Sequence, residues 1–228
     1  MENSIIYKQN STGYQDIGIF KCEQTKTERN IGIKRIQDII LSLLALIILP
    51  PVMLIIIVLI VIDDPQGSPI FSQTRCGKNG TLFKLYKFRS MYVNAEKELG
   101  ELLGYNETTG IAFKMKNDPR VTKVGKFLRK SGLDELPQFW NVLRGEMSIV
   151  GPRPALPVEV EQYNEYYKRR MAAMPGLTCY WQIQPKRNLV SFDEWVEMDI
   201  RYIQEQSFGV DWKIIVLTIG AIIRGEGM

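Results

Sequence analysis

Two adjacent carboxylates, Asp134 and Glu135, carry the clearest chemical signal in the sequence. Arg129 precedes them by about one helical turn, and Arg153 follows in a rigid Pro-Arg-Pro segment. Such a set suits phosphate chemistry, because a carboxylate can attack phosphorus or hold a metal while guanidinium groups bind phosphoryl oxygens. The alternative is structural, with Asp134 as the N-cap of a helix and Glu135 as a surface residue. These residues alone leave both interpretations open.

The neighbouring sequence predicts the element that carries this pair. Apolar residues recur at helical spacing from Leu133 to Leu143, and Pro137 is tolerated only in the first turn of a helix. We therefore expect a helix that begins near Asp134. The free N–H groups and the positive dipole end at such a start favour a carboxylate or a phosphate.

The composition excludes several kinds of chemistry. The 228 residues include no histidine, which rules out histidine-dependent triads, histidine metal sites and histidine general bases. The three cysteines match no zinc-binding spacing, and their odd number is typical of a reducing compartment. The formal net charge of +4 fits anionic lipid or phosphate ligands, but it is too small to indicate binding of nucleic acid.

Residues 36–62 form the one candidate membrane segment, and Asp38 is their only charge. Pro50 and Pro51 lie in the middle, where they remove two backbone donors and should bend the helix. At 1.5 Å per residue each arm rises about 21 Å or less, too little for a hydrocarbon core of about 30 Å. We expect a re-entrant helix that enters and leaves by the same leaflet; a single spanning helix is the alternative.

The charges that flank this segment support the re-entrant prediction. Lys34 and Arg35 precede it, and nearly all the remaining basic residues follow it. A hairpin keeps both flanks in the cytoplasm, as the positive-inside rule prefers. We expect Asp38, one turn further on, to pair with Lys34 or Arg35 at the membrane interface.

A short β-hairpin is expected from residues 70–75 and 81–88, which are separated by a glycine-containing turn. The second run carries Lys84, Lys87 and Arg89 between aromatic residues. This basic run either faces lipid headgroups or a diphosphate, or it is a solvated face of the strand.

Helices are expected in most of the remaining chain. The predicted ranges are 95–103, 121–130, 159–171, 192–206 and 210–223. The last range is too short to span a membrane, so it either packs internally or lies in the membrane interface. Residues 1–33 are polar and aperiodic, without a signal-peptide pattern, and are expected to be a tail.

These segments closely resemble the bacterial sugar transferases, the small monotopic polyprenyl-phosphate phosphoglycosyl transferases. The resemblance runs from about residue 34 to the C-terminus, with its motifs in the family's order. The motifs are Pro69-Ile70-Phe71 with Gln73 and Arg75, Lys87-Phe88-Arg89-Ser90-Met91, Asn117-Asp118-Pro119-Arg120-Val121-Thr122, Leu133-Asp134-Glu135-Leu136-Pro137-Gln138, Gly145-Glu146-Met147-Ser148, Gly151-Pro152-Arg153-Pro154, Pro175-Gly176-Leu177-Thr178 and Trp181-Gln182. Residues 1–33 are not expected to supply the additional transmembrane helices of larger members.

The resemblance implies a specific reaction. A UDP-sugar donates sugar-1-phosphate to a polyprenyl phosphate, usually undecaprenyl phosphate, and UMP is released. Asp134 is the implied nucleophile, which forms a covalent phosphosugar intermediate. Mg²⁺ is the implied cofactor, held by Asp134 and Glu135. The residues agree with this chemistry, because an ionised aspartate needs no general base and hard oxygen ligands suit Mg²⁺.

The resemblance and the charges together supply the other site residues. The donor phosphates and the nucleotide are expected to bind Arg129, Arg153, Lys87, Arg89 and Arg187. The polyprenyl phosphate and the membrane are expected to involve Lys34, Arg35, Asp38, Pro50 and Pro51. The loop 184–188 departs from the family's usual pattern, so its contacts are left open.

The predicted fold class is α+β and mainly helical. An N-terminal re-entrant membrane helix hairpin is followed by a cytoplasmic catalytic domain with a short β-hairpin and interfacial amphipathic helices. The expected divisions are a tail at 1–33, a membrane-embedded helix at 34–62 and a catalytic domain at 63–228. The expected partners are a UDP-sugar, undecaprenyl phosphate and the lipid bilayer at the cytoplasmic face of the bacterial cell membrane. Nucleic acid is not expected, and formation of a homo-oligomer is left open.

Two other functions compete with the transferase. The first is a non-enzymatic, membrane-anchored scaffold for polysaccharide assembly, in which Asp134 only caps a helix. The second is a membrane-attached nucleotide-sugar phosphohydrolase, in which water replaces the lipid acceptor. The sequence does not indicate which sugar is used or which surface polymer is made, whether exopolysaccharide or capsule.

Overall fold

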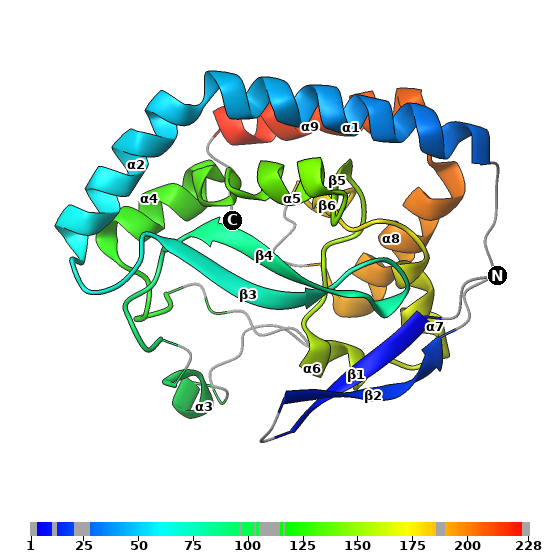
Figure 1. Cartoon of the computed structure of the whole chain (residues 1–228), viewed down its shortest axis with the longest axis horizontal. Coiled ribbons are helices and arrows are strands. Elements are labelled where there is room, and N and C mark those ends of the chain that lie inside the picture. The colour runs from blue at the N-terminus through cyan, green and yellow to red at the C-terminus, as the bar shows by residue number, and fades with distance from the viewer. Residues whose placement is uncertain are drawn as a thin grey trace.

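The computed structural model describes residues 4–10, 13–20, 28–95, 97–102, 104, 115, 117–185 and 190–224. Within these ranges the fold is mainly helical and has three two-stranded sheets, in agreement with the predicted α+β class. Two long N-terminal helices, Glu28–Ile48 (α1) and Pro50–Asp63 (α2), run along one side of the molecule (Figure 1). The sheets and the shorter elements lie beneath them.

The break between α1 and α2 falls at the two prolines, as the sequence predicts. The helix axes meet at 62°, and Pro50 and Pro51 occupy the first positions of α2, where a missing N–H is tolerated. Among the described residues no single helix combines the length and apolarity needed to cross a bilayer. The bent pair α1–α2 meets both requirements only when its two arms are counted together.

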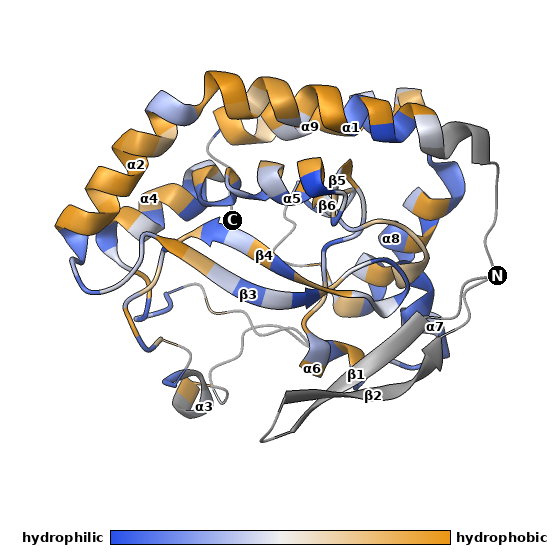
Figure 2. Cartoon of the chain, viewed as in Figure 1, coloured by the Kyte–Doolittle hydropathy of each residue, from blue (hydrophilic) through white to orange (hydrophobic). Residues whose placement is uncertain are grey.

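The outer sides of α1 and α2 are apolar and exposed, as Figure 2 shows. Ile47 is 67 % exposed and Ile62 is 74 % exposed, whereas Ile56 and Ile60 are buried on the inner side of α2. The inner side packs in a cluster that contains Phe88. Each arm therefore has one face on the protein core and one apolar face that the protein does not cover.

The first 33 residues contain structure that the sequence analysis did not predict. Ser4–Asn10 (β1) and Gly13–Phe20 (β2) pair as antiparallel strands, and α1 already begins at Glu28. Apolar residues alternate with polar ones over only a few positions here, which is a weak strand signal in a segment read as an aperiodic tail. The predicted division at residue 34 therefore falls inside α1.

The predicted β-hairpin is confirmed. Ile70–Cys76 (β3) and Leu82–Phe88 (β4) pair antiparallel without a shift of register, joined by a 3₁₀ turn at Lys78–Gly80 (η1). Asn79 and Gly80 both have positive φ in that turn, a conformation that asparagine and glycine tolerate better than other residues.

The segment around the carboxylate pair is a helix, a 3₁₀ turn and a second helix. Lys123–Ser131 (α4) is capped by Thr122 and ends at Gly132, whose φ of +69° is left-handed. Leu133–Glu135 (η3) follows, and Gln138–Arg144 (α5) begins only after it. The predicted helix start near Asp134 is therefore wrong by four residues. The N-cap position of α5 is Pro137, which has no capping side chain.

Two close backbone approaches join these elements to the rest of the domain. A Cβ on Gly125 would lie 2.0 Å from the carbonyl oxygen of Ser90, so α4 can lie against the end of β4 only with glycine there. Ser148–Val150 (β5) pairs parallel with Gly176–Thr178 (β6). Gly151 and Gly176 touch backbone to backbone beside that pair.

The C-terminal half follows the sequence prediction at its end but not at its start. Phe192–Glu205 (α8) and Phe208–Ile223 (α9) form as expected. The single helix predicted at 159–171 is instead Pro157–Val160 (α6), Glu165–Lys168 (α7) and Arg169–Ala172 (η4). Asn164 caps α7 and interrupts the helical backbone. Of the described residues in the predicted helix 95–103, those that are helical are Leu99–Leu102 (α3).

Candidate active site

Asp134 lies in η3, between α4 and α5, and only 3 % of the residue is exposed. Its Oδ1 atom is buried and has no hydrogen-bond partner among the described residues. A buried carboxylate oxygen without a donor is costly, so such atoms are uncommon outside functional sites. The arrangement contradicts the interpretation of Asp134 as a helix cap, because its side chain caps no helix.

Lys87 on β4 brings a positive charge to the carboxylate pair. Its Nζ atom donates to Glu135 Oε1 at 2.7 Å and lies 3.9 Å from Asp134 Oδ2. Strand β4 is held against α5 by Asn141, whose side chain donates to the Lys84 carbonyl and accepts from the Tyr86 amide. These bonds fix β4 on both sides of Leu85 and so place Lys87 beside η3.

Arg129 supplies a second positive charge from the last turn of α4. Its Nε donates to Ser90 Oγ at 2.9 Å, and its guanidinium is close enough to Asp134 to influence it electrostatically. The structure thus brings together four residues that the sequence analysis selected: Asp134, Glu135, Lys87 and Arg129.

Burial and these charges set the protonation of Asp134. Desolvation is the largest influence and raises the pKa of Asp134 from 3.8 to about 6, and the neighbouring Glu135 carboxylate also raises it. Lys87 and Arg129 act in the opposite direction. At neutral pH the carboxylate form still predominates, so Asp134 is a desolvated anion.

The sequence analysis left Arg75 out of the site, although it lies nearby. Arg75 on β3 is buried and donates to the Pro154 carbonyl and Gln73, and its Nε has no partner within the part of the chain that the structure describes. Burial lowers the pKa of its guanidinium to about 10, while the charge of Glu135 raises it. A buried arginine in a strand is itself a signal, but burial was not visible in the sequence.

Gln138 was also missed. Its side chain is almost fully buried one turn after Asp134, and its Nε2 atom has no partner among the described residues. Buried polar atoms without a partner on residues only four positions apart, Asp134 and Gln138, are typical of a site that a ligand completes. Gln138 falls inside the Leu-Asp-Glu-Leu-Pro-Gln motif, so the motif was the signal that could have found it.

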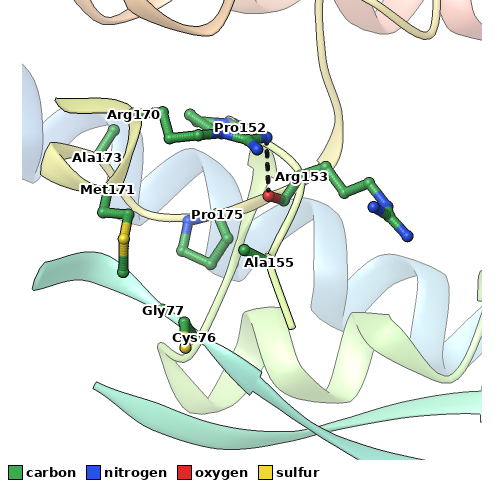
Figure 3. A pocket seen from close by; sticks show the side chains of 9 residues that line it. All are labelled: Cys76, Gly77, Pro152, Arg153, Ala155, Arg170, Met171, Ala173 and Pro175. Carbon is green, nitrogen blue, oxygen red and sulfur yellow. Dashed lines mark hydrogen bonds between the residues drawn. The ribbon is translucent and has the colours of Figure 1, made fainter. Parts of the chain in front are cut away.

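Arg153 lies at the edge of this region rather than at the carboxylate pair. Its Nη1 is 3.8 Å from Glu159 Oε1, and its guanidinium lies over the Trp195 ring at 5.3 Å. In Figure 3 its side chain points away from a small pocket, while Arg170 donates to its carbonyl oxygen. The cavity volume of that pocket is about 10 Å³, far below the 300–1,000 Å³ typical of ligand sites.

Arg89 makes structural contacts. Its Nη1 and Nη2 donate to the carbonyls of Gln66 and Asp64, and the Asp64 carboxylate lies 3.6 Å away. It follows directly after β4 and therefore reaches the turn that precedes β3. These donors are occupied, so its predicted role in phosphate binding has no support in these contacts. Arg187 lies outside the described residues, as does most of the loop 184–188.

The charged side chains near the start of α1 also make their contacts within the protein. Lys34 forms its ion pair with Asp211 at 2.6 Å, so the predicted pairing with Asp38 is wrong. Arg35 donates to the carbonyls of Val142 and Leu143, and Asp38 accepts from Ser148 and the Ile149 amide. The sequence placed these three charges at the start of the membrane segment, but it could not show that they meet the domain.

The donor set fits a magnesium ion that is shared with a substrate. No group of three or more acidic, cysteine or histidine residues that could hold a metal occurs among the described residues. Mg²⁺ usually takes one or two carboxylates and completes its shell with water and substrate phosphates. Asp134 and Glu135, with one carboxylate oxygen unpartnered, supply that number of ligands.

The site combines a buried Asp134 and a half-buried Glu135 with a lysine, an arginine and polar atoms that have no partner among the described residues, which suits chemistry on phosphate groups. Comparison with known proteins makes this specific. The family described as "Bacterial sugar transferase" matches residues 29–225. The chain belongs to the bacterial sugar transferase family.

Curated relatives agree with the family. The chain is 47 % identical over 194 residues to the galactosyl transferase CpsE of Streptococcus agalactiae, covering 85 % of this chain and 43 % of the relative. It is 42 % identical over 194 residues to the UDP-glucose:undecaprenyl-phosphate glucose-1-phosphate transferase of Escherichia coli, covering 82 % of this chain and 39 % of the relative. It spans less than half of either relative.

A relative of similar length also matches. The exopolysaccharide production protein ExoY of Sinorhizobium fredii is 40 % identical over 214 residues, which cover 91 % of this chain and 94 % of ExoY.

Proposed function

We propose that this protein is a phosphoglycosyl transferase that moves sugar-1-phosphate from a UDP-sugar to undecaprenyl phosphate. Two relatives are named as undecaprenyl-phosphate sugar transferases, and another is named for exopolysaccharide production. The observation that carries the proposal is Asp134: it is buried, it has an unpartnered oxygen, and cationic side chains lie on both sides of it.

The first half of the reaction forms a covalent intermediate. A carboxylate oxygen of Asp134 attacks the sugar-linked phosphorus of the UDP-sugar. The bond between that phosphorus and the bridging oxygen breaks, and UMP leaves with the bonding electrons. The cations Lys87 and Arg129 stabilise the charge that develops on the phosphoryl oxygens. No proton is removed from Asp134, so the step needs no general base, consistent with a protein that lacks histidine.

The second half regenerates the carboxylate. A phosphate oxygen of undecaprenyl phosphate attacks the same phosphorus, and the bond to Asp134 breaks. The product is undecaprenyl diphosphate sugar. Glu135 lies beside the reacting centre, where it orients Lys87 through their 2.7 Å hydrogen bond. Arg153, held on the Pro-Arg-Pro segment, binds the phosphate of the nucleotide in this scheme.

Magnesium is part of the proposal. Asp134 and Glu135 would hold the ion together with the diphosphate of the donor, since two carboxylates and substrate oxygens form a usual Mg²⁺ shell. When bound, the ion supplies charge neutralisation at the diphosphate. Binding, orientation and nucleophilic attack remain the work of the side chains described above.

The proposal puts the active site at the cytoplasmic face of the cell membrane, with α1 and α2 as a re-entrant pair. The bend of 62°, the exposed apolar sides of both arms and the basic residues on both flanks support this arrangement. An acceptor phosphate at the depth of the headgroups would then meet a domain that lies on the same side. The transfer to undecaprenyl phosphate at this position would be the first membrane step of a surface polysaccharide pathway.

One assay separates this function from its competitors. UMP release is measured from a panel of UDP-sugars, with and without undecaprenyl phosphate, for the native protein and for Asp134→Asn. The transferase needs the lipid for sustained turnover, and Asp134→Asn abolishes it. The matched control is Asp193→Asn, which makes the same change at an exposed carboxylate on α8 and should retain activity.

The other outcomes are equally clear. Release of UMP at the same rate without lipid identifies a phosphohydrolase, because water has then replaced the acceptor. No release with any UDP-sugar identifies a scaffold. Normal turnover by Asp134→Asn would remove Asp134 as the nucleophile.

A further inference from the structure

One turn of α1 directs three ionisable side chains into the domain beneath it. We call Lys34, Arg35 and Asp38 the tether cluster. They contact the end of α5, strand β5 and helix α9, which are more than a hundred residues away in the sequence. The membrane helix is thus joined to the domain through polar contacts at one point near its start.

Lys34 belongs to a closed network. Its ammonium group donates to Asp211 Oδ2 at 2.6 Å and to the Val150 carbonyl at 2.9 Å. The Tyr202 hydroxyl, which is fully buried, bonds to the same carbonyl and to Asp211 Oδ1. The charge of Lys34 is therefore paired inside the protein: the ion pair links α1 to α9, and the hydrogen bond of Tyr202 adds α8 to the network.

Arg35 connects α1 to the active site through α5. Its two terminal nitrogens donate to the carbonyls of Val142 (2.6 Å) and Leu143 (2.8 Å), in the last turn of α5. The last turn carries the negative end of the helix dipole, so a guanidinium there is favourable, and the Val142 carbonyl accepts from the Gly145 amide as well. The opposite end of α5 begins at Gln138, four residues after Asp134. Helix α5 is seven residues long, which spans about 10 Å.

The tether cluster also fixes which side of α1 faces outward. On its inner side Asp38 and Ser42 are buried, and Asp38 accepts bonds from Ser148 and the Ile149 amide. On its outer side Ile36, Ile40 and Ile47 are exposed. Rotation of α1 about its axis would expose the polar side and bury the apolar one, so these contacts define one orientation.

We propose that Arg35 and the Lys34–Asp211 pair are positioning residues. They set the angle and depth of the domain relative to the bilayer, and thereby the position of Asp134 relative to a lipid-embedded acceptor phosphate. The inference rests on the proposed transferase function and adds a determinant of acceptor use to it. It predicts that loosening the tether impairs reaction with an acceptor held in a bilayer, where the depth of the phosphate is fixed. An acceptor that diffuses freely in detergent is affected far less.

The test compares two acceptors. Arg35→Met removes both donors and keeps an unbranched apolar stem. For native protein and variant, kcat/KM is measured with undecaprenyl phosphate in vesicles and with a short-chain polyprenyl phosphate in detergent. We expect the vesicle-to-detergent ratio to fall about tenfold or more, because misplacement of reacting groups by about 1 Å can cost about 100-fold. KM for the UDP-sugar in detergent should stay unchanged.

Control variants separate positioning from general damage. Arg201→Met makes the same change on α8 at an exposed residue that pairs with Glu205 at 2.8 Å and lies over the Tyr180 ring, away from the tether cluster, and it should leave the ratio unchanged. Arg35→Lys should recover part of the ratio, since an ammonium group can reach one of the two carbonyls. Equal losses with both acceptors, or no loss with either, would overturn the inference.

A second variant guards against misfolding of the first. Lys34→Met combined with Asp211→Leu removes both charges of this ion pair together, so neither of the two is left buried without its partner, and Asp38 keeps its bonds from Ser148 and the Ile149 amide. The same fall in the ratio is expected, and an unchanged ratio would refute the inference. A native protein that releases no UMP with either acceptor would instead refute the proposed function, so the two failures are distinguishable.

Discussion

Asp134→Asn should stabilise the folded protein at neutral and alkaline pH. Burial raises the pKa of Asp134 from 3.8 to about 6, so the fold favours the protonated, neutral side chain. A carboxyl whose folded pKa is raised contributes stability below its unfolded pKa and loses that contribution as the pH rises through about 6. Above that pH the native protein therefore bears the cost of a desolvated carboxylate, and an asparagine does not.

The magnitude follows from the change in pKa. A rise from 3.8 to about 6 is close to two pKa units, and each unit is worth about 1.4 kcal/mol, which gives about 3 kcal/mol. Because Asp134 is 3 % exposed, solvent screening reduces this little. In a chain of this size about 3 kcal/mol corresponds to a rise in Tm of roughly 6–12 °C.

Thermal unfolding in detergent, followed by circular dichroism between pH 3.5 and pH 8, measures the effect. The gain in Tm of Asp134→Asn should be close to zero at pH 3.5, grow through pH 6 and level off by pH 8. The exposed control Asp193→Asn should show no such growth. A variant that is less stable than the native protein at pH 8, or a gain that is the same at every pH, would refute the burial argument. A large gain together with lost turnover would show that the site trades stability for reactivity.

Three further predictions concern the reaction and the topology. kcat/KM for the UDP-sugar should rise about tenfold per pH unit below about 6 and level off above it, because Asp134 is expected to attack only when ionised. Glu135→Gln should move this rise to lower pH, because it removes a negative charge that raises the pKa of Asp134. A kcat/KM that does not change with pH would contradict Asp134 as the nucleophile. Arg153→Lys should lower kcat/KM for the donor by roughly tenfold, since an ammonium cannot replace a bidentate guanidinium; unchanged kinetics would make Arg153 structural. Replacing Pro50 and Pro51 with leucine should restore a continuous helix that spans the membrane. A single cysteine at position 10 should then be labelled by an impermeant reagent in intact cells. Labelling of the same cysteine in the protein that keeps both prolines would exclude the re-entrant arrangement.

The sequence by itself determined the local features of this protein. The break after Leu49 follows from two residues that lack an N–H, and the β3–β4 hairpin follows from alternating side chains around a glycine-containing turn. Helices α8 and α9 follow from apolar periodicity over a long window. The motif around Asp134 and Glu135 identified the carboxylates before any geometry was known. In each case the information lies within a few neighbouring residues.

Short-range signals failed where tertiary contacts compete with them. The helix predicted at 159–171 is interrupted at Asn164, whose side chain caps a new helix. The helix predicted at Asp134 begins only at Gln138, because Gly132 ends α4 in a left-handed conformation and a 3₁₀ turn follows. The strands in residues 4–20 lacked a pattern long enough to predict.

Only the tertiary structure decided which charges serve the site. Periodicity shows which side of an element is polar, but it does not show what that side meets. Thus Lys87 donates to Glu135 across 48 positions of sequence, and Lys34 pairs with Asp211 across 177 positions. Arg89 instead donates to backbone carbonyls of the turn that precedes β3. The pKa of Asp134 is likewise a property of the fold, because desolvation is its largest cause and a side chain loses its water only when distant segments close over it.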